Sequence, residues 1–123
     1  MDKKYCVLCD IDGTILYHHG SIADIKEYEA VLLEGTKEKL EEWNKLDYYI
    51  VLLTARPEDM RDMTIKDLER FELPYDRLIM GLPNYCRVLI NDEKPYMMQD
   101  NINPDTARGI MVKRDKGIKD IIL

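Results

Sequence analysis

The sequence predicts an α/β fold in which helices cover a parallel β-sheet. Short, uninterrupted apolar runs at 5–9, 48–53 and 88–90 are typical of strands buried on both faces of such a sheet. Apolar residues at helical spacing lie between the first two runs, and a second such segment follows the second run. Because strands that alternate with helices build parallel sheets, these observations together predict this fold class.

Length and composition predict one domain that spans 1–123. A chain of 123 residues is long enough for a covered sheet of several strands but too short for a second module. The formal charge of -6 argues against a broadly basic surface for nucleic acid. No apolar stretch reaches the length of a membrane span or forms the core of a signal peptide. We therefore expect a cytoplasmic protein without a membrane partner.

The cysteines predict buried thiols rather than a disulfide framework. The chain has three of them, an odd number, and Cys6 and Cys9 lie within the first apolar run. Their C-x-x-C spacing leaves a redox or zinc role as an alternative, although inside a strand the spacing alone is a weak signal.

The first predicted strand ends in two carboxylates, which form the first element of a candidate site. In an extended backbone Asp10 and Asp12 project to the same side of the chain, so two like charges need a cation. Gly13 allows a sharp turn just beyond, and Thr14 offers a hydroxyl. One carboxylate can attack phosphorus while the other protonates the leaving group and later activates water, with Mg²⁺ neutralising both.

The spelling Asp10-Ile11-Asp12-Gly13-Thr14 after a hydrophobic strand resembles the first motif of the haloacid dehalogenase superfamily of phosphohydrolases. The resemblance implies a nucleophilic Asp10, a general acid and base at Asp12, and bound Mg²⁺. An EF-hand calcium loop is the alternative, but it fits poorly. Its glycine would stand at position four rather than six, and position twelve is Ser21 rather than Glu.

The next segments predict a flap and then a helix. Residues 16–33 have an irregular pattern and are expected to leave the sheet, with His18 and His19 as surface residues that could supply a proton or a metal ligand. From Glu34 a helix is expected, because Leu40, Trp43 and Leu46 recur at helical spacing.

The second predicted strand, 48–53, ends in the second site element. Pro57 suits the first turn of a following helix, so Thr54 lies at a strand end beside a helix start. Its hydroxyl and the nearby backbone N–H of Ala55 are candidates to hold a phosphate oxygen, with a helix cap as the alternative role for Thr54. The arrangement resembles the second motif of the same superfamily. The sequence Leu-Thr-Ala-Arg-Pro-Glu at this point also resembles the phosphatase half of polynucleotide kinases.

A third site element follows a short strand candidate at 78–80. The run 87–92 predicts another buried strand, which ends in Asp92, a carboxylate able to complete a magnesium shell with Asp10 and Asp12. The position resembles the fourth motif of the superfamily. The family usually has two acids at this point, whereas this chain has Asn91-Asp92. Asp92 or Glu93 must therefore supply what the second acid would, with Asp100 as a more distal alternative.

The lysine of the third motif is missing, because the expected Gly-Lys-Pro turn reads Gly81-Leu82-Pro83. Lys94 and Arg87 are the candidates for the positive charge that phosphoryl transfer needs. We favour Lys94, because it follows Asp92 closely, whereas Arg87 belongs to the amino end of the predicted strand. A last short strand is expected at 109–112.

Assembled, these elements predict a single Rossmann-like three-layer sandwich. About forty residues separate Thr14 from Thr54, and a similar number lies between Thr54 and Asp92, so neither interval holds a cap domain. The segment from Ile79 onward also resembles small capless members that accompany surface-polysaccharide biosynthesis. A response-regulator receiver is disfavoured by order, because in that family the phosphorylated Asp precedes the Thr.

The function implied by the resemblance is Mg²⁺-dependent hydrolysis of a phosphomonoester through an aspartyl-phosphate intermediate. The expected substrate is a sugar phosphate or nucleotide. A polynucleotide end and a non-catalytic binding role on the same fold are the alternatives. Capless relatives often use a neighbouring subunit to close the site, so a homo-oligomer is among the expected partners.

Overall fold

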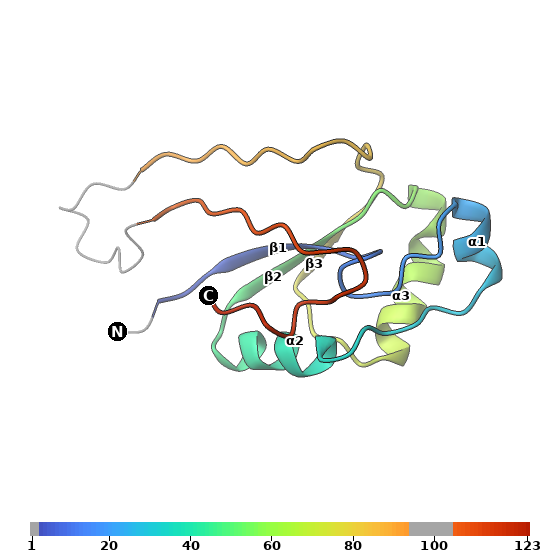
Figure 1. Cartoon of the computed structure of the whole chain (residues 1–123), viewed down its shortest axis with the longest axis horizontal. Coiled ribbons are helices and arrows are strands. Elements are labelled where there is room, and N and C mark those ends of the chain that lie inside the picture. The colour runs from blue at the N-terminus through green and yellow to red at the C-terminus, as the bar shows by residue number, and fades with distance from the viewer. Residues whose placement is uncertain (1–2, 94–104) are drawn as a thin grey trace.

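The computed structural model describes residues 3–93 and 105–123, and it has the predicted α/β organisation (Figure 1). Its sheet has three parallel strands in the order β1 (Cys6–Asp10), β2 (Tyr49–Leu53) and β3 (Arg77–Ile79). Asp10 pairs with Leu53, and Leu53 pairs with Ile79. The three strands therefore end at the same level, which aligns the loops that follow them along one carboxyl edge.

Two predicted helices are confirmed. Helix α2 (Thr36–Lys45) begins after Gly35, whose φ of 82° is a left-handed conformation that glycine adopts without strain. Helix α3 (Arg61–Arg70) follows a short 3₁₀ helix, η1 (Glu58–Met60), which is capped by Pro57. Pro57 thus lies at the N-cap position with an extended backbone, just before the first helical turn where the sequence predicted it.

A third helix, α1 (Ile22–Glu27), lies in the segment that was expected to be irregular. Its start is a capping box, because the hydroxyl of Ser21 accepts from the backbone N–H of Asp24 and the carboxylate of Asp24 accepts from the backbone N–H of Ser21. Only Ile25 of this helix is buried. One buried residue gives no apolar period, which explains why hydrophobic spacing alone did not indicate the helix.

The main core lies between the sheet and helices α2 and α3. Ile50 and Leu52 of β2 pack with Leu40 and Trp43 of α2 and with Leu68 of α3. Buried residues from β1, the loop after it, the segment between α3 and β3 and the C-terminal segment complete this cluster: Cys9, Ile11, Ile15, Leu16, Leu73 and Ile118. The residues that hold the carboxyl edge together thus also form the core.

The expectation that the first strand is buried on both faces is wrong. Cys9 is buried in the main core, but Cys6 is exposed and Leu8 is 45% exposed. Side chains alternate between the two faces of a strand, so this difference means that one face of β1 is covered and the other is open. The buried-thiol prediction therefore holds for Cys9 and fails for Cys6.

Two predicted strands are absent from the described residues. Residues 85–93, the first arm, and residues 105–113, the second arm, are extended but belong to no strand. Val88 and Ile90 in the first arm and Met111 in the second are largely exposed. In Figure 1 both arms run along one side of the sheet, and the side-chain amide of Asn91 donates to the backbone carbonyl of Thr106 between them.

The apolar composition of the arms indicated strands, but a strand also requires a neighbouring backbone to pair with. In residues 85–93 and 105–113 the described contacts between the arms are made by side chains rather than by a backbone ladder. The prediction of strands at 87–92 and 109–112 is therefore wrong for this structure.

Within the described ranges, no helix has the length and the apolar character needed to cross a lipid bilayer.

Candidate functional site

The loop after β1 is a tight turn that fixes both predicted carboxylates at the carboxyl edge. The carbonyl of Ile11 accepts from the N–H groups of Thr14, Ile15 and Leu16, at 2.9 to 3.1 Å. Gly13 has a φ of 88°, and its N–H donates to the carbonyl of Leu16 at 2.7 Å. A residue with a side chain would be strained at that φ, which explains the glycine after the second carboxylate.

Asp12 is held by a buried arginine. The Nε of Arg56 donates to one carboxylate oxygen of Asp12 at 2.8 Å, and Nη2 donates to the other at 2.7 Å. The side chain of Arg56 is 2% exposed and that of Asp12 is 14% exposed. Two parallel charge-assisted hydrogen bonds in a nearly dry setting fix both the position and the plane of this carboxylate.

The other half of the guanidinium faces helix α3. Nη1 of Arg56 donates to the hydroxyl of Thr64 at 3.0 Å and lies 3.5 Å from a carboxylate oxygen of Asp67. Burial alone would lower the pKa of Arg56, but the hydrogen bonds and charge of Asp12, together with Asp67, outweigh it and raise that pKa. Arg56 is therefore a permanent cation between two carboxylates.

Asp10 is in a more open setting. One of its oxygens accepts from the hydroxyl of Thr14 at 3.2 Å, and the other accepts from Nη1 of Arg87 at 2.8 Å. The Asp10 and Arg87 side chains are each about one third exposed. The expectation that Arg87 lies too far from Asp10 to contact it is therefore wrong, because the first arm is not a strand and Arg87 contacts the predicted nucleophile.

Thr54 is buried at the start of the loop that follows β2. Its hydroxyl accepts from the backbone N–H of Arg56 at 3.0 Å, and its carbonyl accepts from the N–H of Leu82. Because Asp10 pairs with Leu53, Thr54 and Ala55 follow directly beside the Asp10 turn. The structure thus brings Asp10, Asp12, Gly13, Thr54 and Ala55 to one edge, and the described contact of Thr54 is to backbone.

The predicted magnesium ligands are only partly brought together. No group of three or more His, Cys, Asp or Glu side chains that could hold a metal ion occurs among the described residues, so Asp92 does not join Asp10 and Asp12. Both oxygens of Asp12 already accept from Arg56. Of Asp10 and Asp12, Asp10 is the one whose setting suits a divalent cation, since its charged partner Arg87 is about one third exposed whereas the partner of Asp12 is buried.

The predicted site residues beyond position 91 belong to the first arm or lie outside the described residues. Asp92 and Glu93 lie at the exposed end of the first arm. Lys94, and likewise Asp100, lies outside the described residues.

Asp115, in the C-terminal segment, forms hydrogen bonds to the turn that follows β1 and to the residues just after it. The backbone N–H of Asp115 donates to the carbonyl of Gly13, and its carboxylate accepts from the backbone N–H of His18 at 2.8 Å. The ring of His19 contacts the carbonyl of Glu29 at 2.9 Å. These contacts give the two histidine positions a role in holding the segment after the turn against the rest of the chain.

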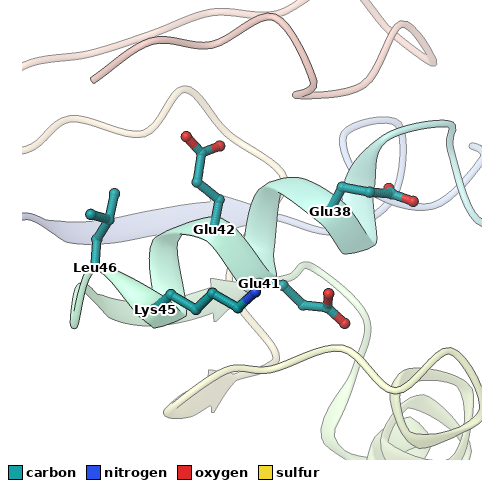
Figure 2. Close-up of a pocket in the computed structure, with 5 residues that line it drawn as sticks. All are labelled: Glu38, Glu41, Glu42, Lys45 and Leu46. Carbon is teal, nitrogen blue, oxygen red and sulfur yellow. The ribbon is translucent and has the colours of Figure 1, made fainter.

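A hollow is also found away from this edge, on the outer side of α2 (Figure 2). It is lined by Glu38, Glu41, Glu42, Lys45 and Leu46. All of these side chains come from α2 or the residue that ends it, and most are charged. A hollow of this kind is a solvated helix face and contains none of the predicted site residues.

Arg56 is the functional residue that sequence reasoning missed. In the sequence it stands between Thr54, a candidate for phosphate binding, and Pro57, and the motif alone does not indicate its partner. A partial signal was available. Asp12 and Arg56 both follow strands that end at the same sheet edge, and an acid directed into a covered edge requires a basic partner.

Comparison of the chain with protein-family models, with curated proteins and with solved structures gave no match.

Proposed function

We propose that this chain is a phosphomonoester hydrolase of the haloacid dehalogenase type. The observation that supports it most is the unlike setting of two carboxylates at one sheet edge. Asp12 is mostly buried and fixed at both oxygens by Arg56, whereas Asp10 is more exposed and is held by Thr14 and the exposed Arg87. Two carboxylates in different environments suit two chemical roles.

In the proposed reaction Asp10 acts as the nucleophile. One of its oxygens attacks phosphorus, the bond from phosphorus to the ester oxygen breaks, and Asp12 gives a proton to the departing oxygen. In the second step Asp12 takes a proton from water, whose oxygen attacks the phosphorus of the aspartyl phosphate. The bond between phosphorus and Asp10 then breaks, which releases phosphate, restores the Asp10 carboxylate and returns Asp12 to the protonated form in which it entered the first step.

We assign the binding of the phosphate group to residues at the same edge. The hydroxyl of Thr54 and the backbone N–H of Ala55 follow β2 beside the end of β1, and Arg87 brings a cation to Asp10. Gly13 contributes the turn itself, since its N–H already donates to the carbonyl of Leu16. Lys94 stays a second proposed source of positive charge.

Mg²⁺ remains the proposed cofactor, with Asp10 as its first ligand. A divalent cation there would offset the charge shared between Asp10 and a bound phosphate group. Both oxygens of Asp12 accept from Arg56, and among the described residues no three carboxylates are grouped as a metal site, so a site of three carboxylates does not describe this chain.

The substrate we propose is a sugar phosphate or a nucleotide, with a polynucleotide end as the alternative. We propose further that the fold is a Rossmann-like three-layer sandwich without a cap. In support, α1, α2 and β2 occupy most of the interval between Thr14 and Thr54. A site without a cap admits large substrates, unless a second subunit covers it.

The test is a screen of the purified chain with Mg²⁺ against sugar phosphates, nucleotides and oligonucleotides phosphorylated at either end. Phosphate release that is lost in Asp10→Asn is the expected result. In Asp12→Asn the second step is impaired, so acid quenching and mass spectrometry should find phosphate on the peptide that contains Asp10. Release that survives in Asp10→Asn contradicts the proposed nucleophile.

One observation favours a second candidate, the binding of phosphate esters without turnover. Each carboxylate already has an arginine partner, Asp10 with Arg87 and Asp12 with Arg56, as in a site adapted to hold an anion. The same screen separates the two functions, because a binding protein would give saturable binding of a phosphate ester in calorimetry with no release of phosphate.

A further inference from the structure

The contacts behind the candidate site extend from Asp12 to helix α3. The guanidinium of Arg56 is buried and makes contacts from two of its edges. Nε and Nη2 donate to Asp12, while Nη1 donates to the hydroxyl of Thr64 at 3.0 Å and lies 3.5 Å from Asp67. Thr64 and Asp67 are three residues apart on α3, so they project from the same side of that helix.

The backbone of Arg56 is fixed as firmly as its side chain. Its N–H donates to the hydroxyl of Thr54 at 3.0 Å, and its carbonyl accepts from the N–H of Gly81 at 2.8 Å. The remaining freedom of the residue is the tilt of the guanidinium plane. Thr64, which is fully buried, and Asp67 are the described groups that restrain this tilt from the side away from Asp12.

We propose that Thr64 and Asp67 are positioning residues that orient the carboxylate of Asp12 through Arg56. The inference rests on the proposed function, in which Asp12 exchanges a proton with the leaving oxygen and with water. Proton transfer requires hydrogen-bond geometry between heavy atoms, so a small tilt of Arg56 moves Asp12 away from its target. Helix α3 thereby sets the geometry of the reaction without contacting the substrate.

The alternative is that these contacts only attach α3 to the sheet. The two explanations differ in how the rate depends on the leaving group. An alkoxide leaves poorly and needs the proton from Asp12, whereas p-nitrophenolate leaves well without it. Loss of positioning therefore affects alkyl phosphates more than p-nitrophenyl phosphate, whereas a general loss of folded protein affects both substrates equally.

The experiment compares Thr64→Val, which keeps the shape but removes the acceptor, with Thr64→Ser, which keeps the hydroxyl. Thr64→Val should lower kcat for an alkyl phosphate about tenfold more than for p-nitrophenyl phosphate, with little change in KM. Thr64→Ser should stay near the wild-type ratio of the two rates. Equal losses on both substrates, or no loss on either, would overturn the proposal.

Asp67→Asn provides a second variant, at a position whose side chain is 21% exposed. It should shift the rate ratio in the same direction as Thr64→Val. Its matched control is Asp62→Asn, which removes the same charge from an exposed position in the first turn of α3. A control that shifts the ratio as much as Asp67→Asn would show that helix charge, and not the contact with Arg56, is responsible.

A readout without turnover separates this inference from the proposed function. The Nε–H signal of Arg56 in ¹⁵N-labelled protein, assigned by its loss in Arg56→Lys, should exchange slowly with solvent because it donates to Asp12 in a buried place. Thr64→Val and Asp67→Asn should each speed that exchange. Unchanged exchange in both variants overturns the inference even if the chain is an active phosphatase. Failure to release phosphate from any substrate, with faster exchange in the variants, rejects the function while the coupling of α3 to Asp12 stands.

Discussion

At the scale of single residues, the site contrasts two arginines that hold two neighbouring carboxylates. Arg56 is buried, has a carboxylate on either side and is fixed along its backbone. Arg87 is exposed and comes from the first arm. An exposed ion pair contributes little to stability, because water and salt screen it. Asp10 can therefore release its arginine partner more readily than Asp12 can.

The first prediction concerns the source of positive charge at the phosphoryl group. If Arg87 supplies it, Arg87→Ala should lower kcat by about 10²-fold, because one charge opposite the developing negative charge is lost. The melting temperature should change little, since the pair with Asp10 is exposed. Steady-state kinetics and a thermal melt measure the two effects.

The matched control is Arg108→Ala, which removes an arginine from the second arm, where it lies over the ring of Tyr5. This variant should keep its activity. A Lys94→Ala enzyme that is crippled, beside a fully active Arg87→Ala, would return the role to Lys94 as the sequence favoured.

The second prediction concerns Cys9 and alkaline pH. Burial raises the pKa of the Cys9 thiol to about 12, with the charge of Asp10 adding to the effect, against an ordinary value of 9.0. The unfolded chain therefore loses this proton first as pH rises. The free energy of unfolding should fall between about pH 9 and 12, by at most about 1.4 kcal/mol per pH unit from this group.

Denaturant unfolding between pH 7 and 11, in the presence of a chelator, tests this prediction. Tyrosine and lysine side chains also titrate in this range, so the decisive quantity is the difference from Cys9→Ala. That variant should lose less stability per pH unit than wild type. Parallel curves for the two proteins would show that Cys9 is not held in a buried, neutral form.

At the scale of secondary structure elements, local sequence patterns predicted an element correctly where its own apolar residues are the ones buried in the core. Helix α2 and strand β2 were predicted because Leu40, Trp43 and the apolar run of β2 are buried in the core that their own spacing indicates. The parallel order followed from the alternation of strands and helices. The carboxyl-edge location of Asp10, Asp12 and Thr54 followed from it in turn.

Other features could not be read from the sequence, because they depend on contacts across long separations. The partner of Asp12 is 44 residues away, and Arg87 is 77 residues from Asp10. Nothing in the local pattern states that Arg56 turns inward. In the first arm, Val88 and Ile90 have the composition of a buried strand, but composition does not provide the neighbouring backbone that a strand needs.

The third prediction follows from this contrast between β2 and the first arm. Backbone N–H groups of Ile50, Val51 and Leu52 lie in a central strand with partners on both sides, so they should exchange slowly with deuterated solvent. Those of Val88 to Ile90 should exchange much faster. Hydrogen exchange followed by mass spectrometry measures both segments in one sample, and equal protection would restore the strand that the sequence predicted at 87–92.

At the scale of the whole molecule, the negative net charge complicates any test for a specific metal site. The formal charge of -6 attracts divalent cations in general, so an effect of Mg²⁺ is informative only if it depends on the site. Within the proposed site, Mg²⁺ would compete with Arg87 for Asp10, since Arg87 already donates to that carboxylate. The geometry around Asp10 therefore has two consequences for the proposed site: Mg²⁺ binding should depend on Asp10, and it should be weakened by competition with Arg87.

The last prediction uses both consequences. If Mg²⁺ binds the folded chain at Asp10, a concentration ten times its Kd should add about 1.4 kcal/mol to the free energy of unfolding, which raises Tm by about 5 °C for a chain of this length. Asp10→Asn should lose this shift, while Arg87→Ala should reach it at lower Mg²⁺ because the competing cation is gone. Thermal melts at constant ionic strength, with NaCl replacing MgCl₂, separate the site from general screening. A shift that is equal in wild type and Asp10→Asn would place the bound Mg²⁺ elsewhere on the acidic surface, and phosphate release that persists in excess chelator would remove Mg²⁺ from the proposed reaction.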